Sequence, residues 1–394
     1  MRQKENSPDI ANERSSPAPA AHLFDWQGSS ARALLKHVPA DEIPSAEDLH
    51  TTESLQQHLD SLREPPFSVI AAGDIMLGGR GKRSVTEHGP NYPFASVLPL
   101  LRRSPIVVGN LEGPFAEKAR KLRRNFSYRV NPALASALTR AGVNVLTLAN
   151  NHLLDCGRSG VLETLEILAR EKLAPLGAGV NEEEAHRPVI RQAGRWRIGL
   201  LGYYWNRRTA ATADKPGSAM DSAESLEADI RALRDRVDRI VTIFHWGVPY
   251  LREPSAEDRA KARLAIDLGA DAVVGHHPHV IQPFEIYHGR PIFFSVGNFA
   301  FGSGNSLAEG LLAGIRFEES STSVSVYPLY VKNRDPRVNY QPKVLRGDRA
   351  KQVLHQLALI SGSSGALLSI EHGRGTVTLP AHSAHSGARE VRIA

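Results

Sequence analysis

Gly275-His276-His277-Pro278-His279 brings three histidines together within four positions, directly after the strand-like apolar run 270–275. Side chains two positions apart point to the same side of extended backbone, so His277 and His279 can direct two ring nitrogens at one metal ion. His276 is then expected to face away or to support the ligands from outside. Histidines on loops often have no special role, so the cluster gains its weight from the rest of the chain.

Polar groups follow four other apolar, strand-like runs upstream. They are Gly73-Asp74, Asn110-Leu111-Glu112, Asn150-Asn151-His152 and His245-Trp246-Gly247. Oxygen and nitrogen donors that arrive from several strand ends are how an open catalytic metal site is built. The pattern therefore indicates a metal site at the strand ends.

The first two of these groups have structural alternatives. Asp74 at the end of a buried strand suits a metal ion, although a turn or a helix N-cap also uses aspartate. Asn110 and Glu112 share one side of extended backbone, so Glu112 can bridge two metal ions while Asn110 supplies a neutral oxygen. A polar turn is the alternative for that pair.

The later groups add acid–base chemistry. Asn151 can bind a metal through its amide oxygen, and His152 can protonate a leaving group or stabilise a charged transition state. Asp155 lies close enough in sequence to orient His152, and helix capping is its alternative role. His245 is interpreted as a metal ligand because it also closes a strand, although a lone histidine there would be structural.

Strand-like and helix-like segments alternate through most of the chain. Ser255 is a predicted N-cap, and residues 187–203 and 311–330 alternate like antiparallel hairpins. This order predicts an α/β fold with two packed sheets. The expected strands are 67–72, 105–109, 143–148, 240–244, 270–275 and 291–296, and the expected helices are 132–141, 160–172, 222–237, 255–268 and 347–360.

Composition shifts divide the chain into four predicted segments. Residues 1–28 are rich in Ser, Pro, Ala and charge and are expected to be disordered. Residues 29–65 form a short helical lead-in, 66–335 form the main domain, and 336–394 form a C-terminal extension packed on it. No apolar run reaches the length of a membrane-spanning helix, and the first residues lack the apolar core of a secretory signal. We therefore expect a cytoplasmic protein.

The charge and cysteine content narrow the possible partners. The chain has 48 Lys and Arg against 42 Asp and Glu, but arginine is spread along it and no nucleic-acid-binding motif occurs, so no nucleic-acid partner is expected. The single cysteine, Cys156, excludes an internal disulfide and a Cys-rich zinc site. One basic cluster, residues 118–124, offers Arg120, Arg123 and Arg124 to phosphate or carboxylate groups of a substrate, and a solvated loop is the alternative.

Taken together, the motifs resemble the CapA family, which is named for poly-γ-glutamate capsule biosynthesis and belongs to the calcineurin-like metallophosphoesterase superfamily. The resemblance covers residues 66–335 in matching order and includes Ser295-Val296-Gly297-Asn298-Phe299. It implies an αββα four-layer sandwich with two divalent metal ions (Mn, Fe or Zn), and His152 matches the catalytic histidine of the superfamily. The residues that match its metal-binding motifs are Asp74, Asn110, Glu112, Asn151, His245, His277 and His279.

Some positions depart from the wider superfamily. Met76 stands where its first motif carries histidine, Asn110 and Glu112 stand where its second motif carries aspartate, and Pro249 stands where family members often carry glutamate. The first two changes put ordinary phosphomonoesterase activity in doubt, and Pro249 implies different substrate contacts at that position.

The resemblance implies a metal-dependent hydrolase that acts on an anionic substrate, either a phosphoester or a γ-glutamyl (amide-linked) compound. The expected partner is an anionic small molecule or a polyglutamate-like polymer. Two alternatives stay open: a non-catalytic accessory protein of polyglutamate or capsule polymer assembly, and a nucleotide phosphodiesterase.

Overall fold

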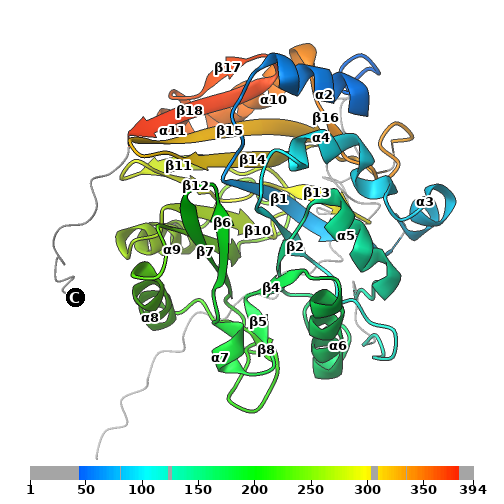
Figure 1. Cartoon of the computed structure of the whole chain (residues 1–394), viewed down its shortest axis with the longest axis vertical. Coiled ribbons are helices and arrows are strands. Elements are labelled where there is room, and N and C mark those ends of the chain that lie inside the picture. Colours follow the sequence, from blue (N-terminus) through cyan, green and yellow to red (C-terminus); the bar gives the residue numbers. More distant parts are fainter. Residues whose placement is uncertain (1–43, 80, 123–126, 303–308, 334, 381–394) are drawn as a thin grey trace, which may run out of the picture. The chain divides into compact units, whose positions relative to one another are not determined.

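The computed structural model describes residues 44–79, 81–122, 127–302, 309–333 and 335–380. These residues form an α/β structure in which two large β-sheets face each other and helices cover their outer sides (Figure 1). The predicted α/β class with two packed sheets is confirmed. The segment 1–28 that we expect to be disordered lies outside the described residues.

The larger sheet has ten strands among the described residues. They are β1 (Val69–Met76), β2 (Val107–Leu111), β3 (Val145–Thr147), β4 (Ala174–Leu176), β13 (Asn298–Phe301), β14 (Glu309–Phe317), β15 (Ser321–Tyr330), β16 (Lys343–Val344), β17 (Ser369–Glu371) and β18 (Arg374–Pro380). β1 to β4 are parallel to one another, and β13 pairs with β1 in the same direction. β14 and β15 form the predicted antiparallel hairpin. β1 and β2, which carry Asp74 and Asn110, therefore lie side by side in the interior of this sheet.

The smaller sheet has six strands in the described part of the chain. In spatial order they are β11 (Phe284–Tyr287), β12 (Arg290–Phe293), β10 (Ala272–His276), β9 (Arg239–His245), β7 (Trp196–Tyr204) and β6 (Val189–Ala193). The four inner strands are parallel, and β6 and β11 run antiparallel at the two edges. The pair β6–β7 is the hairpin predicted at 187–203. A separate short pair joins β5 (Ala178–Gly179) to β8 (Gly217–Ser218).

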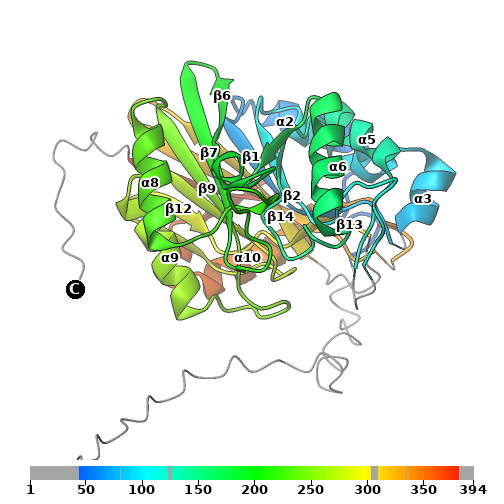
Figure 2. The ribbon, with the colours of Figure 1, turned by 90° about the horizontal axis from the view of Figure 1, so that it is seen from below.

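Helices form the outer two of four layers (Figure 2). The larger sheet is covered by α2 (Thr52–Ser61), α4 (Leu98–Leu101), α5 (Ala135–Ala141) and α6 (Gly157–Arg170), and the smaller sheet by α8 (Ala223–Arg234) and α9 (Ala256–Asp267). Other short elements before the C-terminal segment are α3 (Gly81–His88), η2 (Tyr92–Val97), η3 (Pro132–Leu134) and α7 (Glu182–Ala185). One apolar cluster lies between the sheets and one lies under each helical layer, which gives the predicted αββα order.

The residues of β1 show why its sequence is apolar throughout. Val69 and Ala71 belong to the cluster between the sheets, whereas Ile70 and Ala72 belong to the cluster under the helices. Successive side chains of a strand point to opposite faces, so a strand that is covered on both sides needs apolar residues at every position. The first polar position, Asp74, is therefore conspicuous.

The start of α9 confirms the predicted N-cap. The Ser255 hydroxyl accepts the Asp258 N–H at 3.0 Å, and the Asp258 carboxylate accepts the Ser255 N–H at 3.1 Å. This reciprocal capping box satisfies two backbone donors that the first helical turn leaves free.

Replacing Ser255 with alanine is expected to lower the free energy of unfolding by about 1 kcal/mol, because a cap hydrogen bond is lost and the buried Asp258 loses a partner. Urea-induced unfolding measures the change. The matched variant is Ser222→Ala, since the Ser222 hydroxyl caps α8 by accepting the Ser225 N–H. A Ser255→Ala protein that is less affected than Ser222→Ala would contradict the role of the capping box.

The C-terminal segment extends the larger sheet and covers an edge of the smaller one. β18 pairs with β15, and α10 (Gly347–Ile360) contributes Leu354 and Leu357 to the cluster between the sheets. Ser361 directly precedes α11 (Gly362–Gly365), and Ser364 lies within it. Their hydroxyls accept backbone N–H groups of β11 at 2.9 and 2.8 Å, respectively. Partners for an edge strand protect it from pairing with other chains.

The described residues from 44 to 380 cluster as one compact unit. Helix α2 lies within the predicted lead-in of 29–65. The predicted segment boundaries at residues 65 and 335 stay predictions. Among the described residues, no helix is long and apolar enough to cross a membrane.

Candidate metal centre

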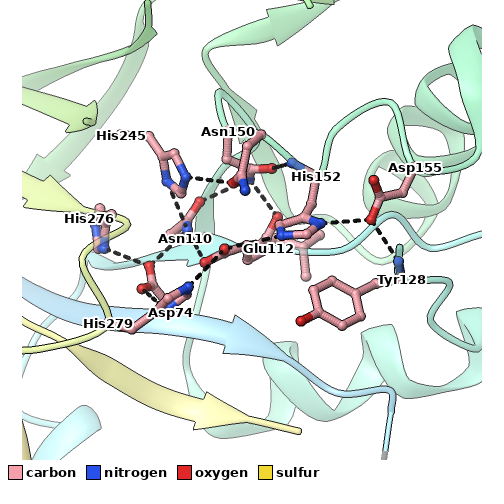
Figure 3. A network of polar contacts seen from close by, with 12 residues as sticks. Asp74, Asn110, Glu112, Tyr128, Asn150, His152, Asp155, His245, His276 and His279 are labelled. Carbon is pink, nitrogen blue, oxygen red and sulfur yellow. Dashed lines mark hydrogen bonds and ion pairs between the residues drawn. The ribbon is translucent and has the colours of Figure 1, made fainter. Parts of the chain in front are cut away.

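Strand register brings the predicted ligands to one end of the two sheets. In the larger sheet, Asp74 pairs with Asn110 of β2 and with Asn298 of β13. In the smaller sheet, His245 of β9 pairs with His276 of β10. A contact of 3.3 Å between Asn110 Nδ2 and His245 Nδ1 joins the sheets at this point (Figure 3).

Two buried carboxylates form the middle of the site. Asn110 Nδ2 donates to Asp74 Oδ1 at 2.8 Å and to Glu112 Oε2 at 3.2 Å, and all three side chains are fully buried. Asn110 and Glu112 thus share one side of the chain, as their spacing predicts. In this orientation the Asn110 nitrogen, not its oxygen, faces the carboxylates, so its role as a metal ligand stays a prediction.

Amide groups from the loop after β3 complete one side of the site. Asn151 Oδ1 lies 2.8 Å from His245 Nε2. Asn150 Nδ2 donates to Asn110 Oδ1 at 3.0 Å and to the Leu111 carbonyl at 2.9 Å. Asn150 therefore fixes the Asn110 amide from behind, and Asn151 reaches the histidine of the opposite sheet.

The three histidines of the 275–279 segment all reach the site region. His276 Nδ1 lies 3.3 Å from Asp74 Oδ1, and His279 Nδ1 lies 3.0 Å from Asp74 Oδ2. The His277 and His245 rings are 4.6 Å apart between centroids. Of the two alternatives for His276, facing away is wrong, because its register with His245 turns it toward Asp74.

The backbone of this segment is strained. His277 has φ of 98° and His279 has φ of 57°, in the left-handed region that side chains other than glycine rarely adopt. Such conformations persist only where surrounding structure enforces them, and they concentrate at functional sites. The turn presents both imidazoles to Glu112, whose Oε1 lies 3.4 Å from His279 Nε2.

The potential ligand atoms fall into two overlapping groups that share Glu112. One holds Glu112, His277 and His279, and the other holds Asp74, Glu112 and His245, with all ligand atoms of a group within 4.8 Å of one another. Within the described structure, Glu112 Oε1, Asp74 Oδ2, His277 Nδ1 and both ring nitrogens of His276 are buried and make no hydrogen bond. Buried polar atoms without partners are costly. Nitrogen and oxygen donors without thiolate suit Mn, Fe or Zn, so the residues fit divalent metal ions.

Burial controls the protonation of these groups. It raises the pKa of Glu112 well above its ordinary value. It lowers the pKa of His245 well below its ordinary value and that of His277 to about 3, so both rings are neutral, the form that binds metals. Burial alone would raise the pKa of Asp74, but contacts with His276 and His279 hold that pKa well below the ordinary value. Burial alone would lower the pKa of His279, yet Glu112 and Asp74 raise it to about 9.

His152 lies beside the metal-ligand groups and is held by an aspartate. Its Nδ1 is 2.7 Å from Asp155 Oδ2, which also accepts the Tyr128 N–H at 2.6 Å (Figure 3). Its Nε2 lies 3.6 Å from Glu112 Oε1. Asp155 is therefore placed to orient the histidine. Cys156, the N-cap of the next helix, makes no capping hydrogen bond through its side chain.

The basic cluster is only partly described. Arg120 is exposed, and within the described residues no hydrogen bond or ion pair joins it to the metal-ligand groups. Arg123 and Arg124 lie outside the described residues. Leu122 N donates to the Asp155 carbonyl at 2.7 Å, so the segment passes beside the residue that holds His152. The substrate-binding role of these arginines stays a prediction.

Four further residues, to which no role was predicted, border the site. Asn298 Oδ1 lies 3.0 Å from His279 Nδ1, and Asn150 supports Asn110. The Tyr128 ring lies 4.5 Å from the His152 ring, and the Tyr250 ring lies 6.0 Å from the His279 ring. The two asparagines stand inside the quoted motifs, and Tyr250 directly follows Pro249 in the family motif that begins at His245, so these three could have been found there. Tyr128 carries no sequence signal.

One departure from the wider superfamily, Met76, has a local explanation. Met76 is buried, and its sulfur accepts the Gly78 N–H at 3.2 Å. Its side chain therefore stabilises the turn after β1.

Comparison with known proteins identifies the family. The family model "Bacterial capsule synthesis protein PGA_cap" matches residues 68–303. The capsule biosynthesis protein CapA of Bacillus anthracis is 32% identical over 283 residues, which are 69% of this chain and 69% of that protein. A probable polyglutamine synthesis accessory protein of Mycobacterium tuberculosis is 30% identical over 52% of this chain and 59% of its own length.

Among solved structures, TT1561 of Thermus thermophilus aligns with 63% of this chain and 94% of its own chain, at 14% identity and a TM-score of 0.37. A TM-score this low supports no conclusion about function.

Proposed function

Because the chain belongs to the bacterial capsule synthesis protein family PGA_cap, we propose that it is a metal-dependent hydrolase of an anionic substrate with phosphoester or γ-glutamyl amide bonds. The observation that carries the proposal is the pair of ligand groups that share Glu112, with buried nitrogen and oxygen atoms that make no hydrogen bond within the described structure. A protein that only bound a polymer would have no use for so many buried ligand atoms.

The residues that would hold two metal ions come from both sheets. They are Asp74, Asn110, Glu112, Asn151, His245, His277 and His279. Bound divalent ions would polarise the scissile group and lower the pKa of a water nucleophile. Asn150 and Asn298 would position these ligands, since each contacts one of them directly.

His152 is the proposed general acid. The Asp155 carboxylate contacts Nδ1 of His152, and Nε2 of the same ring points toward Glu112. Hydrolysis adds the oxygen of water to phosphorus or to the carbonyl carbon and breaks the P–O or C–N bond. His152 Nε2 supplies the proton that the departing oxygen or nitrogen takes, and the proton that water loses restores it.

A non-catalytic accessory protein is the second candidate. The name of the Mycobacterium tuberculosis relative, a synthesis accessory protein, favours it. In that case the anionic polymer would bind at the same edge of the sheets without being cleaved.

Hydrolysis assays distinguish the two candidates. Protein loaded separately with Mn, Fe(II) or Zn is offered p-nitrophenyl phosphate, bis-p-nitrophenyl phosphate and γ-glutamyl-p-nitroanilide. Cleavage that depends on the metal and on His152 supports the hydrolase and shows whether the bond is a monoester, a diester or an amide. Metal-loaded protein that cleaves none of them contradicts the hydrolase and favours the accessory role.

A further inference from the structure

Two tyrosines border the metal centre and have no role in the proposed hydrolysis. Tyr128 lies between β2 and η3, and Tyr250 lies between β9 and α9, so the two come from different sheets. Both are half-buried, and neither hydroxyl makes a hydrogen bond with a described residue. A tyrosine hydroxyl usually has a partner when the ring is buried. These two hydroxyls are therefore available to a ligand.

Contacts between rings join both tyrosines to the site. The Tyr128 ring lies 4.5 Å from the His152 ring and 6.1 Å from the Phe301 ring, between centroids. The His279 ring lies 4.8 Å from Phe301 and 6.0 Å from Tyr250. One tyrosine thus lies beside the proposed general acid and the other beside a proposed metal ligand.

The turn that carries the histidines also fixes Tyr250. Its φ is 67°, in the left-handed region, and its N–H donates to the Pro278 carbonyl at 2.7 Å. Pro278 stands between His277 and His279. A strained residue persists only where its surroundings enforce the conformation, and such residues concentrate at functional sites. The position of Tyr250 is therefore coupled to that of the proposed ligands.

Tyr128 is fixed from the other side of the site. Its N–H donates to Asp155 Oδ2 at 2.6 Å, the same oxygen that contacts His152 Nδ1. Figure 3 shows the Tyr128 ring beside His152, with the phenol oxygen on the side away from Asp155. The backbone contact therefore leaves the hydroxyl directed away from the residue that anchors it.

The charges around the two hydroxyls call for neutral donors. Burial raises the pKa of Tyr128 and of Tyr250, and the Glu112 carboxylate adds to the effect at both, so both phenols lie within range of its charge. No lysine or arginine in the described part of the chain forms an ion pair with Asp74 or Glu112. A phenol donates one hydrogen bond and carries no positive charge, so it does not compete with metal ions for these carboxylates.

We propose that Tyr128 and Tyr250 bind the substrate, because their hydroxyls are placed to donate hydrogen bonds to the oxygens of an anion held at the metal centre. The inference rests on the proposed function, which places the scissile group there. Because the tyrosines come from different sheets, the two hydrogen bonds together restrict how the anion is oriented. Hydrogen bonds to charged oxygens are stronger than those between neutral groups.

Binding of inorganic phosphate to metal-loaded protein tests the proposal. Calorimetric titration compares the wild type with Tyr128→Phe and Tyr250→Phe, which keep the ring and remove only the hydroxyl. Each variant should bind phosphate about tenfold more weakly, because it loses one hydrogen bond to a charged group. The metal content and the free energy of unfolding should stay unchanged, because neither hydroxyl has a partner among the described residues.

Tyr203→Phe is the matched control. The Tyr203 ring belongs to the apolar cluster under the helices of the smaller sheet, and its hydroxyl donates to Asp229 Oδ2 at 2.9 Å. This variant loses a hydrogen bond within the protein, so it should unfold more easily and keep its affinity for phosphate. The two site variants should show the opposite result in both measurements.

Three results would overturn the proposal. They are a metal-loaded wild type that binds no phosphate, site variants that bind phosphate as tightly as the wild type, and site variants that lose metal or stability together with affinity. The last result would make the tyrosines structural. The proposed function fails separately, by the absence of hydrolysis in metal-loaded protein that still binds phosphate through the two hydroxyls.

Discussion

Metal-free Glu112→Gln protein should be more stable than the metal-free wild type, and the order should reverse once metal is added. Glu112 is fully buried, lies in both ligand groups and has one carboxylate oxygen without a hydrogen bond among the described atoms. Without metal, replacing this carboxylate with a neutral amide should raise the free energy of unfolding by about 1–2 kcal/mol. With metal, the shared ligand is lost, and hydrolysis should fall about a thousandfold.

Chemical unfolding with and without Mn or Zn measures both halves of this prediction. Glu163→Gln is the matched control, because the Glu163 carboxylate accepts three backbone N–H groups, of Glu117, Lys118 and Ala119, away from the ligand groups. That variant should destabilise both forms equally. A Glu112→Gln protein that is less stable than the wild type in the absence of metal would mean that the carboxylate is structural.

Replacing His152 with glutamine should lower kcat by about a hundredfold to ten-thousandfold while the bound metal stays unchanged. The imidazole lies beside the ligand groups and is held by Asp155, so it is placed to transfer a proton. Glutamine keeps the polarity of the side chain but cannot act as an acid. Steady-state kinetics together with elemental analysis of the same sample test this.

Asp155→Asn separates proton transfer from orientation. It removes the charge beside His152 Nδ1 but leaves an oxygen for the Tyr128 N–H, so its kcat should fall less than that of His152→Gln. If His152→Gln loses its metal together with its activity, His152 is a ligand or a structural residue and not the proposed acid.

Local patterns in the sequence were sufficient to predict most elements of the fold. Apolar runs predicted the central strands, and the Ser255 capping box marked the start of α9. The ends of strands were less accurate: β1 continues to Met76, beyond the predicted end at residue 72. Its last part pairs with β13, more than two hundred residues later, and such distant pairing leaves no local signal.

The candidate site, like the fold, was only partly predictable from local sequence patterns. Spacing and strand position predicted which side chains gather at this edge, because parallel strands bring their ends to one edge of a sheet. The orientation of His276 depends on the register between β9 and β10 and on the left-handed turn at His277, neither of which periodicity reveals. The position of Tyr128 depends on how its loop folds over the site, which no local pattern reveals.

The most direct test of a two-metal centre is the metal content of the untagged protein, measured by elemental analysis beside a His277→Ala/His279→Ala double variant. About two equivalents of Mn, Fe or Zn are expected in the wild type, and most of that metal should be lost in the variant, because one ligand group loses two of its members. A wild-type protein that contains no metal and takes up none of the three would contradict the metal centre and the hydrolase with it.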